Sequence, residues 1–370
     1  MSEVLDFIQR VIDRTGFTRE VFVDRKLPLN LSRLRIIPFF GDSRSEFVLA
    51  TLILPRLFPE DYTIVCSWPG HGGLYSGISE YWSITDEDAL SDLARNLDGF
   101  NNFKAGQYER LLLRYFDNVT TIDQLVPQYY LHGFGEMFFE NFDKIEYHLP
   151  SLPSVSLGWD DTAALNRKER IFLMPTKYIT RWSNKGSSSQ MFVEEKFWSN
   201  LVNKLLARDY MPILMQNYMT YDLSPEFASQ CAYITERNIL ARLGVMRACD
   251  CVLDVFNGLS RYALAARCPY FICDERQRYF STRDYILDDL CGSELPKGFL
   301  FSFAPMATTD AAERVNSAIV NRLYDFLLKV NRNSLPSTVE CTQSLSYDNI
   351  RKREINRIGV RFISLPQEDK

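Results

Sequence analysis

The chain has 370 residues and a formal net charge of −5, with 24% charged, 46% hydrophobic and 14% aromatic residues. This composition excludes a disordered chain, and the acidic net charge disfavours electrostatic binding over a broad surface to nucleic acid or to an anionic membrane. No stretch is long and apolar enough to cross a bilayer, and the N-terminus does not resemble a signal peptide. We therefore expect a cytoplasmic protein, either free or attached peripherally to a membrane.

The N-terminal half opens with an amphipathic helix and then alternates strand and helix patterns. Apolar runs at 34–40 and 62–68 predict strands, and the apolar spacing at 46–54 predicts a helix between them. This order predicts a parallel pair of strands with the helix on one face. A Gly-Asp-Ser break follows the first strand, where Asp42 could cap the following helix.

A glycine-rich run follows the second strand. It contains His71, Gly72 and Gly73 and lies at the carboxyl end of the strand, where open α/β sheets bind ligands. It has no G-x-G-x-x-G fingerprint, so a plain surface loop is the more common outcome. His71 is a candidate acid–base residue, although a lone histidine more often has no such role.

The C-terminal half repeats the alternation of strands and helices after a proline-rich connector. Its expected elements are strands at 170–175, 211–215, 251–255 and 270–273 and helices at 192–208, 240–248, 259–266 and 310–330. The fold class is therefore α/β, with two tandem Rossmann-like domains facing across a cleft. We expect these domains at 1–155 and 165–330, and a tail, 331–370, that packs back on the first domain.

Two segments of the second half are candidates for binding a phosphate group. The loop at 176–190 carries Lys177, Arg181 and Lys185 after a strand, although a solvated loop would have the same composition. The turn after the strand at 251–255 begins with Asn257 and Gly258 and leads into a helix with Ser260 and Arg261 in its first turn. Backbone N–H groups at a helix N-terminus favour anions. Arg261 could instead pair with the nearby Asp254 and serve the structure only.

A metal centre is not expected. The eight cysteines form no Cys-x-x-Cys pair, and the chain has only three histidines, none of them near a pair of cysteines. Reduced thiols buried in apolar segments fit a reducing compartment.

The order of elements and a few motifs resemble the GT-B glycosyltransferases, and most of all the lipopolysaccharide heptosyltransferase-like group. The motifs are a Gly-Asp ending at Asp42, a Pro-Thr-Lys ending at Lys177 and an Asn-Gly-Leu beginning at Asn257. The resemblance implies GT-B architecture, with an acceptor domain first and a nucleotide-sugar donor domain second. It covers most of the chain in the order of elements but only these few residues in motif.

The resemblance also implies an activity. The protein would move a sugar from a nucleotide-diphosphate sugar to a hydroxyl of a glycan, a lipid-linked sugar or another acceptor, with inversion and without a metal or a further cofactor. Asp42 matches the family's general base, although it could equally serve as a helix cap. Phe256 stands where the family has an aspartate and Arg261 where it has a histidine, so two donor contacts differ.

Two other functions stay open on this architecture. A sugar-nucleotide epimerase would need further carboxylates and a histidine around the cleft. A binding protein that kept the fold and lost the chemistry would explain Phe256, because function depends on the site and not on the fold.

Overall fold

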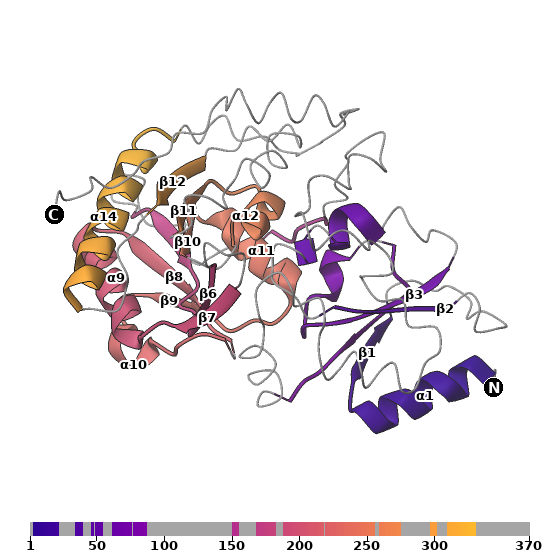
Figure 1. The fold of residues 1–370 in the computed structure, drawn as a ribbon. Coiled ribbons are helices and arrows are strands. Elements are labelled where there is room, and N and C mark those ends of the chain that lie inside the picture. The colour runs from indigo at the N-terminus through magenta and orange to yellow at the C-terminus, as the bar shows by residue number, and fades with distance from the viewer. Residues whose placement is uncertain are drawn as a thin grey trace.

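The computed structural model describes residues 3–21, 34–39, 46–47, 49–54, 61–75, 77–86, 150–154, 168–182, 188–217, 219–255, 259–274, 297–301 and 309–330. Within them the chain forms two α/β units that follow one another in sequence (Figure 1). We call residues 3–86 the first unit and residues 168–330 the second unit. The expected tail at 331–370 and the expected boundary near 155–165 lie outside the described residues.

The first unit is built on a four-stranded sheet with the order β1-β4-β3-β2. Its elements are α1 (Glu3–Thr15), β1 (Thr18–Val21), β2 (Leu34–Pro38), a π-type helical segment (Leu49–Ile53), β3 (Tyr62–Ser67), a 3-10 turn (Gly72–Leu74) and β4 (Glu80–Ser83). β2, β3 and β4 are parallel, and β1 pairs antiparallel with β4 at the edge. All residues of β3 are buried, as expected for a central parallel strand.

The second unit is built on a six-stranded sheet with the order β12-β11-β10-β5-β8-β9, and all its pairs are parallel. Its strands are β5 (Arg170–Leu173), β8 (Met211–Met215), β9 (Ala232–Ile234), β10 (Cys251–Val255), β11 (Tyr270–Asp274) and β12 (Lys297–Phe301). Its helices are α9 (Glu195–Ala207), α10 (Ser224–Phe227), α11 (Ile239–Ala248), α12 (Ser260–Ala266) and α14 (Thr309–Leu327). The α/β class with parallel sheets is confirmed.

The strand order places a topological switch point between β5 and β10. From β5 the chain passes to β8 and β9 on one side, and it then returns through α11 to β10 on the other side. In open parallel sheets the segments that follow two such strands diverge, and ligands bind between them at the carboxyl edge. The switch point therefore predicts where a ligand of the second unit would lie.

The two faces of this sheet have different neighbours. Cys251, Leu253 and Val255 belong to the apolar core that α9 and α14 cover. Side chains alternate along a strand, so Val252 and Asp254 point to the opposite face. Figure 1 shows α11 and α12 on that opposite face, between the second sheet and the first unit. These two helices are thus the elements of the second unit that meet the first.

Glycines of the first unit allow α11 to approach closely. A Cβ on Gly70 would lie 2.1 Å from the carbonyl oxygen of Arg237, and one on Gly73 would lie 2.7 Å from Cγ of Leu240. The carbonyl of Gly70 accepts a hydrogen bond of 2.7 Å from the backbone N–H of Ile239, the first residue of α11. We call the contact of residues 67–75 with α11 and α12 the junction.

Residues 176–190 differ from the loop that the sequence predicts. They include an antiparallel ribbon of β6 (Tyr178–Trp182) and β7 (Ser188–Phe192). The polar composition suggested a loop, but a two-stranded ribbon satisfies its own backbone groups by cross-strand pairing and needs no apolar face of its own. Arg181 therefore lies on a strand of this ribbon.

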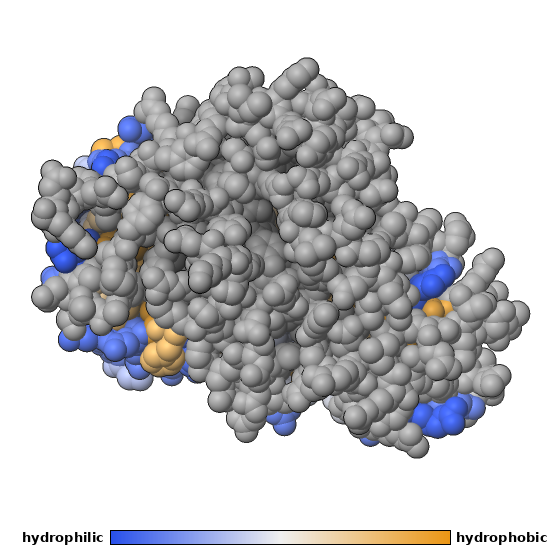
Figure 2. Space-filling model, in the orientation of Figure 1, coloured by the Kyte–Doolittle hydropathy of each residue, from blue (hydrophilic) through white to orange (hydrophobic). Residues whose placement is uncertain are grey.

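Figure 2 shows mainly hydrophilic described residues on one face, with hydrophobic areas that are small. Among the described helices, none combines the length and the hydropathy needed to cross a membrane.

The six cysteines in the described part are buried and form no disulfide there. Burial raises the pKa of the Cys231 thiol to about 12 and raises the pKa of Cys66 well above its usual value. Because the thiolate is the reactive form, we expect a thiol-specific dye at pH 8 to modify at most Cys291 and Cys341 in the native protein. All eight should react in denaturant, and rapid modification of Cys66 or Cys231 in the native state would contradict their burial.

Candidate functional site

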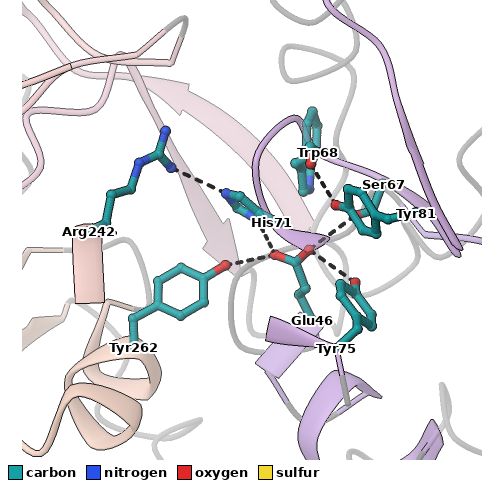
Figure 3. A network of polar contacts seen from close by, with 8 residues as sticks. All are labelled: Glu46, Ser67, Trp68, His71, Tyr75, Tyr81, Arg242 and Tyr262. Carbon is teal, nitrogen blue, oxygen red and sulfur yellow. Dashed lines mark hydrogen bonds and ion pairs between the residues drawn. The ribbon is translucent and has the colours of Figure 1, made fainter. Parts of the chain in front are cut away.

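A buried carboxylate, Glu46, is the centre of the polar network at the junction (Figure 3). Its side chain is 0% exposed, and four side chains donate hydrogen bonds to it. Ser67 and Tyr75 donate to Oε1 at 3.1 and 3.0 Å, and His71 Nδ1 and Tyr262 donate to Oε2, each at 2.7 Å. A carboxylate offers about four lone-pair sites, so these donors satisfy it fully.

His71 joins Glu46 to the second unit. Its Nδ1 faces Glu46, and its Nε2 lies 3.3 Å from an NH group of Arg242. The ring of Tyr262 stands edge-on to the imidazole, with 6.2 Å between the ring centres. His71 is thus held from three sides by groups that come from both units.

Glu46 stays ionised in spite of its burial. Burial alone would raise the pKa of its carboxyl group, but His71 and the hydroxyls of Tyr262 and Tyr75 lower the pKa below its usual value. Hydrogen bonds to the charged form are the physical cause of such a shift. The junction therefore contains a fixed negative charge.

The network residues lie at or after the carboxyl ends of strands. In the first unit, Glu46 follows β2, while His71 and Tyr75 follow β3. In the second unit, Arg242 lies in α11 after β9, and Tyr262 lies in α12 after β10. The carboxyl edges of the two parallel sheets therefore meet at the junction, and that edge is where α/β folds bind ligands.

A second buried carboxylate has a different setting. Glu80 on β4 is 0% exposed and accepts hydrogen bonds from Arg19, Tyr62 and Trp82. These partners belong to the first sheet and its edge strand, away from the second unit. Glu80 serves to tie β1 to the sheet and is a useful control for Glu46.

The structure describes only part of the donor site that the sequence predicts. Lys177 is half-buried in the segment between β5 and β6, where its N–H donates to the carbonyl of Met219 and its carbonyl accepts from Val193. Arg181 lies on β6, and Ser260 and Arg261 are the first residues of α12. The described part of the structure does not include the side chains of these three residues. The residues that lie wholly outside the described part are Asp42, Lys185, Phe256, Asn257 and Gly258.

Lys177 and the start of α12 follow neighbouring strands of the second sheet. Lys177 follows β5 and α12 follows β10, and these two strands flank the switch point. Leu259, the residue before α12, makes no side-chain hydrogen bond that caps the helix. Because α12 has only 7 residues, its helix dipole is small.

The glycine-rich loop has a packing role that the sequence did not show. Gly72 is buried and Gly73 faces the side chain of Leu240, so both lie against α11. Asn238 caps α11 by accepting from the N–H groups of Leu240 and Ala241. The N–H groups that begin α11 are therefore already occupied within the protein.

Sequence reasoning missed Glu46, Arg242 and Tyr262 as site residues. Glu46 was placed in the helix at 46–54, and Arg242 and Tyr262 in helices with otherwise apolar faces. A signal was present, because each is a polar residue at a position that helical periodicity assigns to the buried side. Buried polar groups need partners, and here the partners are one another.

No protein-family model and no curated protein sequence matches this chain. Among solved structures it is similar to the ADP-heptose lipopolysaccharide heptosyltransferase II of E. coli, at 11% identity and a TM-score of 0.42, over 80% of this chain and 98% of that one. It is also similar to a family 9 glycosyl transferase from Veillonella parvula, at 9% identity and a TM-score of 0.42, over 81% and 98%. A putative UDP-N-acetylglucosamine 2-epimerase from Listeria monocytogenes matches at 10% identity and a TM-score of 0.35, over 83% and 93%.

The heptosyltransferase-like group that the sequence resembles is thus also what the structure is similar to. All three TM-scores are below 0.5, so these similarities do not indicate the activity of this chain.

Proposed function

We propose that the protein is a glycosyltransferase that moves a sugar from a nucleotide-diphosphate sugar to a hydroxyl acceptor. The observation that supports this most is the switch point of the second unit, which lies beside an acid–base network of the first unit. Transfer to a hydroxyl needs both parts: cations that stabilise the leaving diphosphate and a base that takes the hydroxyl proton.

The second unit would hold the donor. Lys177 follows β5, and Arg261 lies in α12 after β10, so both side chains start at the switch point. Arg181 and Lys185 would add charge from the ribbon, and Asn257, Gly258 and Ser260 would add polar contacts. Fixed cations are most effective where water is excluded, because the charge of the diphosphate grows as the sugar leaves.

The first unit would hold the acceptor. Asp42, His71, Gly72 and Gly73 form this side of the proposed site, and one of the two ionisable residues takes the proton. A single base acting directly gives inversion, and we propose a reaction without a metal or a further cofactor. The acceptor would be a glycan, a lipid-linked sugar or another hydroxyl compound, in the cytoplasm or at a membrane surface.

Binding of nucleoside diphosphates tests the donor site. We expect ADP, UDP, GDP or CDP to raise the melting temperature of the wild-type protein, because a ligand that binds only the folded state stabilises it. Lys177→Ala should weaken that ligand by about tenfold or more, since hydrogen bonds to charged groups contribute ~1.5–3 kcal/mol.

Lys196 is a matched control, because it is an exposed lysine on α9 at the far face of the sheet. Lys196→Ala should leave the ligand's effect unchanged. If no diphosphate shifts the melting temperature of the wild-type protein, the transferase proposal is wrong, and so is the epimerase alternative.

A further inference from the structure

We propose that His71, and not Asp42, takes the proton of the acceptor hydroxyl, and that Glu46 is the positioning residue that makes this possible. This inference rests on the proposed function and names the residue that performs its proton transfer. It is drawn from the network at the junction, in which a buried carboxylate, an imidazole and a guanidinium form one chain of contacts (Figure 3).

Burial separates the roles of the two residues. Glu46 is 0% exposed, and hydrogen bonds occupy both of its oxygens, so a substrate has no access to it. The side chain of His71 keeps 12% of its surface exposed. The imidazole can therefore meet a substrate, while the carboxylate can act only through the imidazole.

The partners of His71 define its tautomer. An ionised carboxylate only accepts hydrogen bonds, so Nδ1 carries the proton that it donates to Glu46. A guanidinium only donates, so Nε2 offers its lone pair to Arg242. The imidazole is then neutral, and Nε2 is its basic atom, as in carboxylate–histidine pairs that act as general bases.

Arg242 occupies Nε2 in the resting state with a replaceable contact. At 3.3 Å this contact is longer than the four hydrogen bonds to Glu46, which span 2.7 to 3.1 Å. A hydroxyl of the acceptor is also a donor, so it can take the place of Arg242 without a change of tautomer. Nε2 would then accept a hydrogen bond from the group that is to react.

The proposed step conserves atoms and charge. The hydroxyl proton passes to Nε2 of His71 while an electron pair of the hydroxyl oxygen forms the bond to the anomeric carbon. The bond from that carbon to the diphosphate oxygen breaks, and its electron pair leaves with the diphosphate. The imidazolium that forms lies beside the charge of Glu46, which stabilises it until the proton passes to solvent.

This arrangement depends on contact between the two units. Tyr262 and Arg242 belong to the second unit and contact Glu46 and His71 of the first. The hydrogen bond from Tyr262 fixes the carboxylate oxygen that also accepts from Nδ1. His71 is therefore oriented as a base when the unit that carries the donor is docked.

The test compares rates of donor hydrolysis, with water as the acceptor, using ADP-, UDP- and GDP-sugars at pH 8. We expect His71→Gln to lower kcat by about 10²- to 10⁴-fold, the usual contribution of a general base, with little change in KM. Glu46→Gln should lower kcat as well, because an amide that donates to Nδ1 forces the proton onto Nε2. Glu80→Gln, which changes an equally buried carboxylate, should keep the wild-type kcat.

A nitrogen NMR spectrum gives a readout that does not depend on activity. Nε2 of His71 should show the shift of an unprotonated ring nitrogen in the wild-type protein and of a protonated one in Glu46→Gln. Wild-type kcat in His71→Gln, together with a large loss in Asp42→Asn, would overturn the inference, as would a protonated Nε2 in the wild-type protein at pH 8. A wild-type protein that hydrolyses no donor would instead refute the proposed function itself.

Discussion

Gly70→Ala is expected to destabilise the junction by about 2–5 kcal/mol. Gly70 has a φ of +78°, which costs a residue with a Cβ ~1–2 kcal/mol. The added Cβ would also lie 2.1 Å from the carbonyl oxygen of Arg237, and crowding of this kind typically costs a further ~1–3 kcal/mol. Backbone atoms occupy the space, so no side chain can rotate away to relieve the contact.

The crowding is relieved when the backbones of Gly70 and Arg237 move apart, which separates the two units at this point. That movement would lengthen the hydrogen bond from Ile239 N–H to the Gly70 carbonyl and weaken the contacts of α11 with the glycine-rich loop. We therefore expect Gly70→Ala to lower the denaturant midpoint and to increase protease cleavage between the units. Donor hydrolysis should fall as well, since Glu46 would lose the hydrogen bond from Tyr262 that fixes the carboxylate beside His71.

Gly77→Ala provides the matched control. Gly77 has nearly the same φ, +77°, but a Cβ there would meet no atom within 4 Å. Its substitution measures the backbone strain alone, at ~1–2 kcal/mol. Equal losses of unfolding free energy in the two variants would show that the close approach of Arg237 contributes nothing to stability.

The sequence predicted the parts of the fold that local patterns encode. Apolar runs identified β2, β3, β5, β8, β10 and β11, and helical spacing identified α9, α11, α12 and α14. These elements bury one or both faces, so their periodicity reflects their place in the structure. The resemblance to GT-B proteins rested on their order.

The elements that the sequence missed depend on pairing partners far away in the chain. β1 has four exposed residues and is a strand because it pairs with β4, more than fifty residues later. β12 contains Gly298 and a lysine, and it is a strand because it pairs with β11. β6 and β7 mix polar and hydrophobic residues, and in the described part they pair only with each other. Local propensity is weak in such strands, and tertiary pairing decides.

The candidate site was predicted only in part, for a related reason. The glycine-rich loop and the loop after β5 were identified because polar or glycine residues follow apolar strands. The pairing of His71 with Glu46 joins residues 25 apart, and that of Tyr262 with Glu46 joins residues 216 apart. A single sequence does not reveal which buried polar residues meet, so the centre of the network became visible only in the structure.

The final prediction concerns how much the charge on Glu46 contributes to the stability of the folded protein. At pH 7, Glu46→Gln should lower the free energy of unfolding by about 3–5 kcal/mol, the usual cost of breaking a buried charged network. The amide has no charge for His71 and the two tyrosine hydroxyls to contact, and its NH₂ group replaces an oxygen that accepts hydrogen bonds. The measurement is urea denaturation of the wild-type protein and the variant at a series of pH values.

The difference between wild type and Glu46→Gln should shrink in acid. The folded state lowers the pKa of Glu46 below its usual value of 4.5, so the folded protein binds this proton less readily than the unfolded chain does. The contribution is therefore fully present above pH 4.5 or so and is lost as the pH falls through the folded pKa. The variant has no proton to gain at this position, so its stability should decline less between pH 6 and pH 3.

Asp222→Asn separates the effect of burial from that of a lowered pKa. Hydrogen bonds from the side chain and backbone of Ser224 also lower the pKa of Asp222, but this carboxylate is exposed on the second unit. Water screens an exposed charge, so its loss should change the pH dependence of stability much less than the loss of Glu46. If both variants reduce the pH dependence of the unfolding free energy equally, burial at the junction does not explain the contribution of Glu46 to stability. The carboxylate of Glu46 would then hold His71 less strongly than its contacts indicate.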